Sequence, residues 1–253
     1  MGISKSKSRR AKSRLDLILV ERGHAGTQRA AQAIIMAGHV RVNGQPATKP
    51  GSMFAADLQI DIVGEKQKYA SRAGLKLEGA LEDFNVGVDH AVCLDIGAST
   101  GGFTDCLLQQ GAKRVHAVDV NTAQLDFRLQ RDKRVVAIKK NARYLKLNDI
   151  PEAADLITID VSFISVAKIL GPVATLAKPG GTFLILVKPQ FELPKCNVKE
   201  GGVVTDPALH EHAIAGVRAA AERAGLEILG VRRSRLAGAE GNQEFFLHAR
   251  RAR

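Results

Sequence analysis

The chain has 253 residues, of which 45% are hydrophobic and 25% charged, and its net charge is +11. This hydrophobic content is enough to bury the core of one large domain, or of a large and a small one, and it excludes global disorder. A positive surplus of this size favours a polyanionic partner, most often nucleic acid.

The positive charge is concentrated at the ends of the chain. Residues 1–63 carry +6 and residues 231–253 carry +4, whereas residues 64–230 carry only +1. We expect two basic regions that contact nucleic acid on either side of a nearly neutral core. The C-terminal region contains Arg232, Arg233 and Arg235.

Several protein classes are disfavoured. The cysteines are few and widely spaced, so neither a metal site nor a disulfide framework is expected. The basic N-terminus has no apolar stretch behind it, and no apolar run approaches the roughly 20 residues that cross a bilayer. We expect a cytoplasmic protein with no membrane contact, and no feature indicates a protein partner.

The N-terminal part predicts a small α+β domain. Residues 1–13 are expected to be a flexible basic tail, and residues 14–63 the folded unit. Helices are expected over about 14–23 and 28–37, the second with Thr27 as its N-cap.

A β-hairpin is expected next, because Asn43-Gly44 lies between short alternating runs. A further strand is predicted over residues 58–63. The polar residues 64–70 are expected to be a linker to a second domain over 71–253.

Strands and helices alternate in this second domain. This pattern with apolar strands is typical of an α/β fold, a Rossmann-like parallel sheet with helices on both faces. The last pair of strands, joined by a glycine-rich turn, is a candidate for antiparallel pairing. Strands are predicted at 92–96, 114–118, 135–138, 156–159, 182–187, 227–233 and 243–249, and helices at 71–84, 103–110, 165–176 and 207–224.

A glycine-rich loop follows the first of these strands. Loops at this position of open α/β sheets bind ligands, and glycine lets the backbone approach them. The spacing departs from the dinucleotide fingerprint, and no Walker motif follows. The alternative is a tight turn without a ligand. The segment reads Asp95-Ile96-Gly97-Ala98-Ser99-Thr100-Gly101-Gly102.

An acidic residue at the end of the next strand, Asp119, could hold the ribose hydroxyls of an adenosyl ligand. Carboxylates suit a cationic sulfonium and repel a pyrophosphate, so S-adenosylmethionine is predicted rather than NAD. Its expected binding residues are Asp95, Gly97, Ala98, Ser99, Thr100, Gly101, Gly102, Asp119, Asn141 and Ala142.

Charged residues are expected at the carboxyl edge of the sheet. Asp160 and Lys188 each end a predicted strand. Lys76 lies in the predicted helix before the first strand of this sheet, and Glu244 lies on the last strand. Charges there are costly to bury without a partner. They suit methylation of a hydroxyl, with Lys188 as base or as stabiliser of the developing alkoxide. In this hypothesis Asp160 and Lys76 tune Lys188, and Glu244 orients the set; solvated strand ends or structural ion pairs are the alternative.

Several segments resemble known families. Arg14-Leu15-Asp16, Gln28-Arg29-Ala30 and Val40–Gly44 resemble the small S-four-type RNA-binding domain. Residues 71–249 resemble FtsJ-like ribose methyltransferases, whose Lys-Asp-Lys-Glu tetrad falls on Lys76, Asp160, Lys188 and Glu244. Together with segments such as 69–77, the chain resembles the TlyA family.

The resemblance implies 2′-O-methylation of cytidine in ribosomal RNA, with S-adenosylmethionine as donor and ribosomal RNA or ribosomal subunits as partner. Some family members modify only the large subunit and others both, so modification of the small subunit stays open. On the small domain, the set expected to track RNA phosphates is Arg14, Arg29, Arg41 and Lys49.

Two alternatives are weaker. One is an RNA-binding protein with an inactive cofactor-binding domain, which an intact tetrad disfavours. The other is a membrane-active hemolysin, a label that family members have carried; no amphipathic or spanning segment supports it. The long loop over 189–206 is expected to be either a lid or a plain surface excursion.

Overall fold

The computed structural model describes residues 12–55, 57–63, 68–198, 201–238 and 240–253. Contacts divide the chain into two compact units, residues 1–66 and residues 67–253, which are described separately. Among the described residues, no helix is both long and apolar enough to cross a bilayer.

The helices of the small unit are α1 (Leu15–Glu21) and α2 (Gln28–Met36). The N-cap prediction for α2 is confirmed, because the Thr27 hydroxyl accepts a hydrogen bond of 3.1 Å from the backbone N of Ala30. Apolar side chains from both helices form the core of this unit together with residues of its sheet.

The hairpin is also confirmed. Strand β2 (Val40–Val42) pairs antiparallel with β3 (Gln45–Pro46) and with β5 (Ile60–Ile62). In the turn, Asn43 and Gly44 have φ of +50° and +78°. Left-handed backbone at both positions matches the twist of a two-residue hairpin.

The start of the small unit differs from the prediction. Strand β1 (Lys12–Arg14) pairs antiparallel with β4 (Met53–Ala55), a pairing that the sequence did not suggest. Residues 12 and 13 therefore lie in a strand and not in the expected tail. The rest of that tail, residues 1–11, lies outside the described residues. Such short, partly charged strands carry no alternating signal, so only their pairing defines them.

The described part of the large unit contains one sheet of seven strands, in the order β11-β12-β10-β9-β6-β7-β8. The strands from β10 to β8 are mutually parallel, and β12 runs antiparallel to both β10 and β11. Their bounds are β6 (Val92–Ile96), β7 (Arg114–Asp119), β8 (Val135–Lys139), β9 (Ala154–Ile159), β10 (Ala177–Val187), β11 (Leu226–Arg233) and β12 (Phe245–Arg251).

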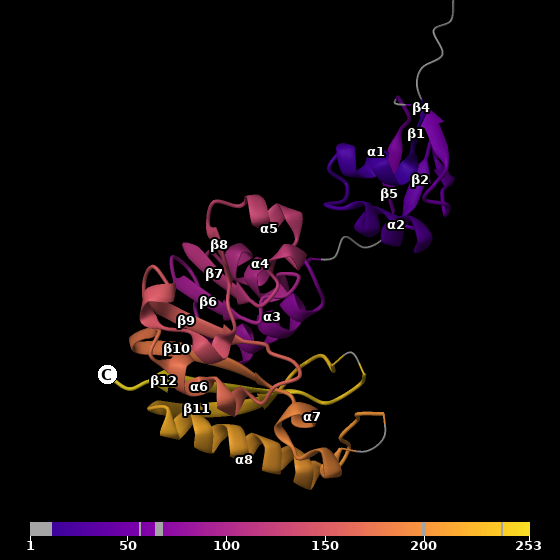
Figure 1. The fold of residues 1–253 in the computed structure, drawn as a ribbon. Helices are drawn as coiled ribbons and strands as arrows, with labels where there is room; N and C mark the ends of the chain where they lie inside the picture. Colours follow the sequence, from indigo (N-terminus) through magenta and orange to yellow (C-terminus); the bar gives the residue numbers. More distant parts are fainter. Residues whose placement is uncertain (1–11, 56, 64–67, 199–200, 239) are drawn as a thin grey trace, which may run out of the picture. The chain divides into compact units, whose positions relative to one another are not determined.

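Helices cover both faces of this sheet (Figure 1). On one face, α3 (Ala73–Asp83) and α4 (Gly102–Gln109) share a core with Leu184 of β10. On the other face, α8 (Pro207–Arg223) packs with the next residue of that strand, Ile185. Alternate strand residues thus face opposite layers, as the predicted α/β fold requires.

The remaining helical segments are short. The predicted helix 165–176 is broken into η4 (Val166–Lys168) and α6 (Leu170–Ala174), and α5 (Phe127–Arg131) was not predicted. The others are η1 (Thr122–Gln124), η2 (Ala142–Tyr144), η3 (Leu147–Asp149), α7 (Pro189–Glu192) and η5 (Lys195–Asn197).

The expected linker is shorter than predicted. Residues 64–67 lie outside the described residues, but Tyr69 is buried in the core of the large unit. The backbone N of Ala70 donates a hydrogen bond of 2.8 Å to the Asp105 carboxylate in α4. The aromatic ring, and not the polarity of its neighbours, decides where the large unit begins.

The order of the central strands creates a position at which α/β sheets bind ligands. Chain order reverses at the neighbours β6 and β9, because β7 and β8 lie on one side of them and β10 on the other. The loops after β6 and β9 leave the sheet at the same edge. Open α/β sheets bind ligands at such a switch point.

Candidate functional site

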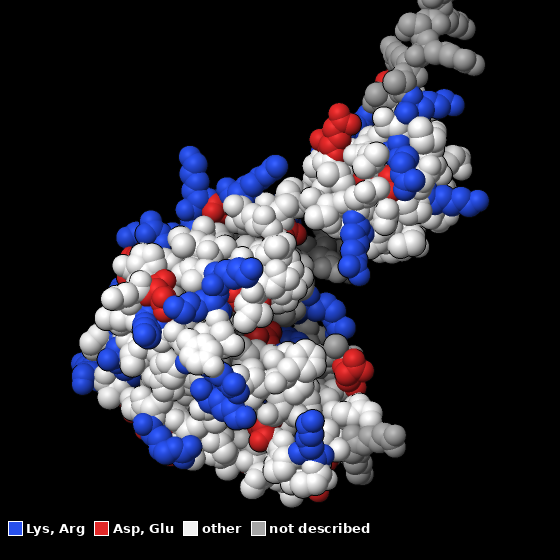
Figure 2. Space-filling model, viewed as in Figure 1, with Lys and Arg blue, Asp and Glu red and all other residues white. Residues whose placement is uncertain are grey.

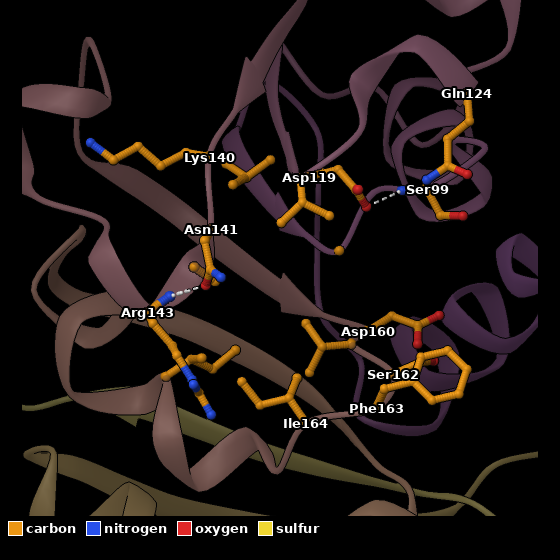
Figure 3. Close-up of a pocket in the computed structure, with 16 residues that line it drawn as sticks. Ser99, Asp119, Gln124, Lys140, Asn141, Arg143, Asp160, Ser162, Phe163 and Ile164 are labelled. Atoms are coloured by element: carbon orange, nitrogen blue, oxygen red, sulfur yellow. Dashed lines mark hydrogen bonds between the residues drawn. The ribbon is translucent and has the colours of Figure 1, made fainter.

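A pocket of about 690 Å³ lies at this carboxyl edge, and its volume is in the range of small-molecule sites. Figure 3 shows Asp160, Ser162 and Phe163 grouped at one end and Lys140, Asn141 and Arg143 at the other. The full lining is Gly97, Ser99, Val118, Asp119, Val120, Gln124, Lys140, Asn141, Ala142, Arg143, Asp160, Val161, Ser162, Phe163, Ile164 and Ile169.

Five of the residues predicted to bind the cofactor line this pocket: Gly97, Ser99, Asp119, Asn141 and Ala142. The Asp119 carboxylate accepts hydrogen bonds of 2.9 Å from the backbone N of Ser99 and of Asn121. These bonds fix its orientation between the loops that follow β6 and β7 (Figure 3). Asn141 caps η2 by accepting a bond of 3.0 Å from the backbone N of Arg143.

Asp95 is placed behind the pocket and not in its lining. It is fully buried in β6 and accepts hydrogen bonds from the hydroxyls of Thr104 at 2.7 Å and Thr158 at 3.2 Å. Burial raises the pKa of Asp95 to about 7, against the opposing effect of these hydrogen bonds. The carboxyl group therefore ties β6 to β9 and to α4 beneath the site.

The other predicted loop residues, Ala98, Thr100, Gly101 and Gly102, also lie outside the pocket lining. Ala98 is buried, and the Thr100 carbonyl accepts a hydrogen bond of 3.0 Å from the backbone N of Asp126. Of the glycine-rich loop, only Gly97 and Ser99 therefore line the pocket.

The glycines of this loop are explained by packing within the protein. A Cβ on Gly97 would lie 2.2 Å from the Asp160 carbonyl oxygen, and one on Gly102 would lie 2.2 Å from the Ser71 hydroxyl. Gly101 has φ of +94°, and its Cβ would lie 2.2 Å from the Leu129 side chain. Close approach to a ligand, the reason expected from the sequence, is not needed to account for them.

The lysine and aspartate that end neighbouring strands form an ion pair. Lys188 Nζ lies 2.6 Å from Asp160 Oδ1 and donates a hydrogen bond of 2.9 Å to the hydroxyl of Ser162. Lys188 is 8% exposed, so its ammonium group is largely desolvated and is stabilised by these partners. Ser162 was missed in the sequence, although it lies two residues after a candidate aspartate.

Lys76 and Glu244 form the other ion pair of the tetrad. Lys76 Nζ, in α3, lies 2.5 Å from Glu244 Oε2, and Glu244 is 2% exposed. Glu244 directly precedes β12, which begins at Phe245. The sequence hypothesis had Lys76 acting on Lys188; in the structure each lysine has its own carboxylate partner.

The four RNA-contact candidates of the small unit differ in their surroundings. Arg29, Arg41 and Lys49 are exposed. The Arg14 guanidinium donates bonds of 3.0 and 2.7 Å to the carboxylate of Asp16, which is fully buried. This pairing lowers the pKa of Asp16, so Arg14 has a structural partner that the sequence did not indicate.

The C-terminal basic region is less available than its charge suggested. Arg235 makes ion pairs of 2.6 Å with both Glu82 and Asp83, and the Arg232 guanidinium lies 5.9 Å from the centre of the Phe84 ring. Lysine and arginine side chains are dispersed over the visible face of the large unit (Figure 2). Arg232, Arg233 and Arg235 all remain exposed, so contact of this region with nucleic acid stays a prediction.

The loop over 189–206 is more structured than a plain excursion. It contains α7 and η5, and its Leu193 and Val204 pack on Ala213 of α8. The backbone N of Val204 donates a hydrogen bond of 2.8 Å to the buried Asn242 side chain. The described ends of this loop are thus anchored, while residues 199–200 lie outside the described part.

Comparison with known proteins agrees with this architecture. Residues 69–251 match the FtsJ-like methyltransferase family, and residues 13–60 match the S4 domain. A solved structure from Streptococcus thermophilus, described as a hemolysin, is 40% identical, with a TM-score of 0.72 over 96% of this chain and 89% of that one.

Curated relatives carry more specific names. The "16S/23S rRNA (cytidine-2'-O)-methyltransferase TlyA" of Mycobacterium tuberculosis (strain CDC 1551 / Oshkosh) is 42% identical over 94% of this chain and 90% of its own length. The "23S rRNA (cytidine-2'-O)-methyltransferase TlyA" of Campylobacter jejuni is 36% identical over 76% and 74%. The chain therefore belongs to the FtsJ-like methyltransferase family, in the TlyA group that joins this fold to an S4 domain.

Proposed function

We propose that this protein transfers a methyl group from S-adenosylmethionine to the 2′-hydroxyl of a cytidine in ribosomal RNA. The observation that carries the proposal is the ion pair of Lys188 and Asp160, whose carboxylate lines the pocket. The names of the relatives support the same reaction.

The pocket residues suit an adenosyl cofactor. Asp119 is oriented to accept hydrogen bonds from ribose hydroxyls, and Asn141 and Ala142 lie where an adenine ring would bind. S-adenosylmethionine would supply a methyl group on a positively charged sulfur. The carboxylate of Asp160, at the opposite end of the lining in Figure 3, favours that charge.

Lys188 is proposed to act on the hydroxyl oxygen that receives the methyl group. An ammonium has three donors; Lys188 donates one to Ser162, and its charge is paired with Asp160 through the 2.6 Å contact. A further donor can reach the 2′-oxygen, and this hydrogen bond strengthens as negative charge develops there. The hydroxyl proton can pass to the Asp160 carboxylate or to water, while Lys76 and Glu244 hold the neighbouring edge of the sheet.

The small unit is proposed to hold the RNA through exposed cations, which include Arg29, Arg41 and Lys49. Such side chains bind RNA phosphates and recognise the shape of the folded RNA. The target nucleotide must leave its stack, because the pocket lies within the protein. Ribosomal RNA as substrate favours the cytoplasm as the site of action.

Methyl transfer tests the proposal directly. The protein is incubated with tritiated S-adenosylmethionine and deproteinised 16S RNA, deproteinised 23S RNA or separated subunits, and the RNA is digested to nucleosides. We expect label in 2′-O-methylcytidine. Label in a methylated base, or RNA binding without incorporation on any substrate, would contradict it; the latter would favour an RNA-binding protein without catalysis.

A further inference from the structure

Glu192, in α7, makes a paired contact that the proposed reaction does not use. Its Oε2 accepts a hydrogen bond of 2.6 Å from the Ser165 hydroxyl, and its Oε1 accepts one of 2.8 Å from the backbone N of Val166. The carboxylate is partly buried, and burial raises its pKa. Burying a carboxylate has a desolvation cost, which these two charge-assisted hydrogen bonds offset.

This contact joins the segments that follow the catalytic strands. The turn after β9 runs from Asp160 to Ser165, and the segment after β10 runs from Lys188 to Glu192. Lys188 holds the beginning of the turn through Asp160 and Ser162. Glu192 holds its end through Ser165 and Val166.

The turn between these two sets of contacts is strained. Phe163 has φ of +65°, which costs a residue with a Cβ about 1–2 kcal/mol. Its ring contacts Phe191 with a centroid separation of 5.2 Å but remains 92% exposed, so burial does little to hold the turn. Strained backbone persists only where the surrounding structure fixes it.

We propose that Glu192 is a positioning residue: it holds the strained Asp160–Ser165 turn so that Asp160 and Ser162 stay on Lys188 and Val161–Ile164 keep the shape of the pocket wall. Glu192 acts through the turn and not on the reacting atoms. The kinetic part of this inference rests on the proposed methyl transfer, whereas the structural part does not.

The test compares Glu192→Ala with the isosteric Glu192→Gln. Alanine removes both acceptors, whereas glutamine keeps an acceptor for the Val166 amide and a polar partner for Ser165. We expect Glu192→Ala to lower kcat about 10-fold or more, as loss of hydrogen bonds to a charged group allows, with KM for RNA changed less than about 3-fold. Glu192→Gln should recover most of kcat.

Two measurements do not require turnover. Hydrogen exchange of peptides spanning Val166 should speed up in Glu192→Ala and stay near wild type in Glu192→Gln, because only the former frees that amide. Calorimetry with S-adenosylhomocysteine as the probe should show weaker binding to Glu192→Ala. Glu211→Ala, an exposed carboxylate on α8, is the matched control and should match wild type in every measurement.

Unchanged exchange at Val166 together with unchanged kcat in Glu192→Ala would overturn the proposal. If Glu192→Ala fails to fold, Ser165→Ala replaces it; this change removes the bond to Glu192 Oε2 and also the 3.2 Å cap bond from the backbone N of Ala167. It should show a smaller change in kcat and in exchange, and wild-type values of both would overturn the proposal. If the wild-type protein methylates no ribosomal RNA, the proposed function fails, while exchange still decides the role of Glu192.

Discussion

Two turns leave neighbouring parallel strands at the site, and they differ in kind. The turn after β6, residues 97–101, contains glycines whose missing side chains make room for the protein's own atoms. The turn after β9, residues 160–165, contains no glycine; both turns hold one residue with a side chain in left-handed backbone, Ser99 in the first and Phe163 in the second. The first stands out in the sequence, yet the second presents more chemically useful groups to the pocket.

The aspartates of these strands show the same difference. Asp95 is fully buried between threonine hydroxyls, whereas Asp160 lines the pocket beside a lysine. A glycine pattern therefore reports backbone constraint, and the position of a polar side chain relative to the sheet edge decides whether it can reach a ligand. Substitutions in the turn after β6 should mainly lower stability, whereas substitutions around the turn after β9 should mainly lower methyl transfer.

The largest effect is expected from Lys188→Ala. Removing the ammonium should lower methyl transfer about 10²–10⁴-fold, because the developing charge on the hydroxyl oxygen loses its donor. Binding of S-adenosylhomocysteine should fall far less than turnover, since Lys188 helps to hold the Asp160–Ser165 turn but is not itself in the pocket lining. Single-turnover methylation and calorimetry measure the two effects, and near-normal turnover would remove Lys188 from its assigned role.

The next effect is expected from Gly101→Ala in the first turn. Alanine at φ of +94° is strained, and its Cβ would lie 2.2 Å from Leu129. We expect the free energy of unfolding to fall by about 2–4 kcal/mol, from strain and overpacking together. Urea unfolding measures this change. Gly87→Ala is the control, because no atom lies within 4 Å of its Cβ position; equal losses in both variants would refute the packing explanation.

A pH effect is expected from Asp95→Asn. The folded-state pKa of Asp95 is about 7, above its ordinary value of 3.8, so the folded protein retains a proton that the unfolded chain releases between these values. Wild-type stability relative to Asp95→Asn should therefore be greatest at low pH and decline as pH rises through about 4 to 7, by at most about 1.4 kcal/mol per pH unit. Chemical denaturation at several pH values measures this difference, and a constant difference would contradict the raised pKa.

The smallest effect is expected from Ser162→Ala in the second turn. Lys188 loses one hydrogen-bond acceptor but keeps Asp160, so methyl transfer should fall about 3–10-fold. The measurement is kcat under saturating cofactor, with Ser162→Thr as the variant that keeps the hydroxyl. A loss as large as that of Lys188→Ala would show that the ion pair alone does not hold the lysine.

Elements with a strong local signal were predicted well. Thr27 caps α2 as expected, Asn43 and Gly44 form the hairpin turn, and the strand over 92–96 has the predicted bounds. Elements defined by contacts were missed: β1 exists only because β4 pairs with it, and Tyr69 joins the core despite its polar neighbours. Local sequence cannot report a partner that lies far along the chain.

The sequence by itself determined the family, the α/β alternation, the glycine loop and the identities of the four charged residues of the tetrad, because these depend on residue type and spacing. Only the tertiary structure decided how they combine. It paired Lys188 with Asp160 and Lys76 with Glu244, placed Asp95 behind the pocket and engaged Arg235 with acidic partners. Charge and hydrogen-bonding capacity belong to a residue, but the distance that makes them an interaction belongs to the fold.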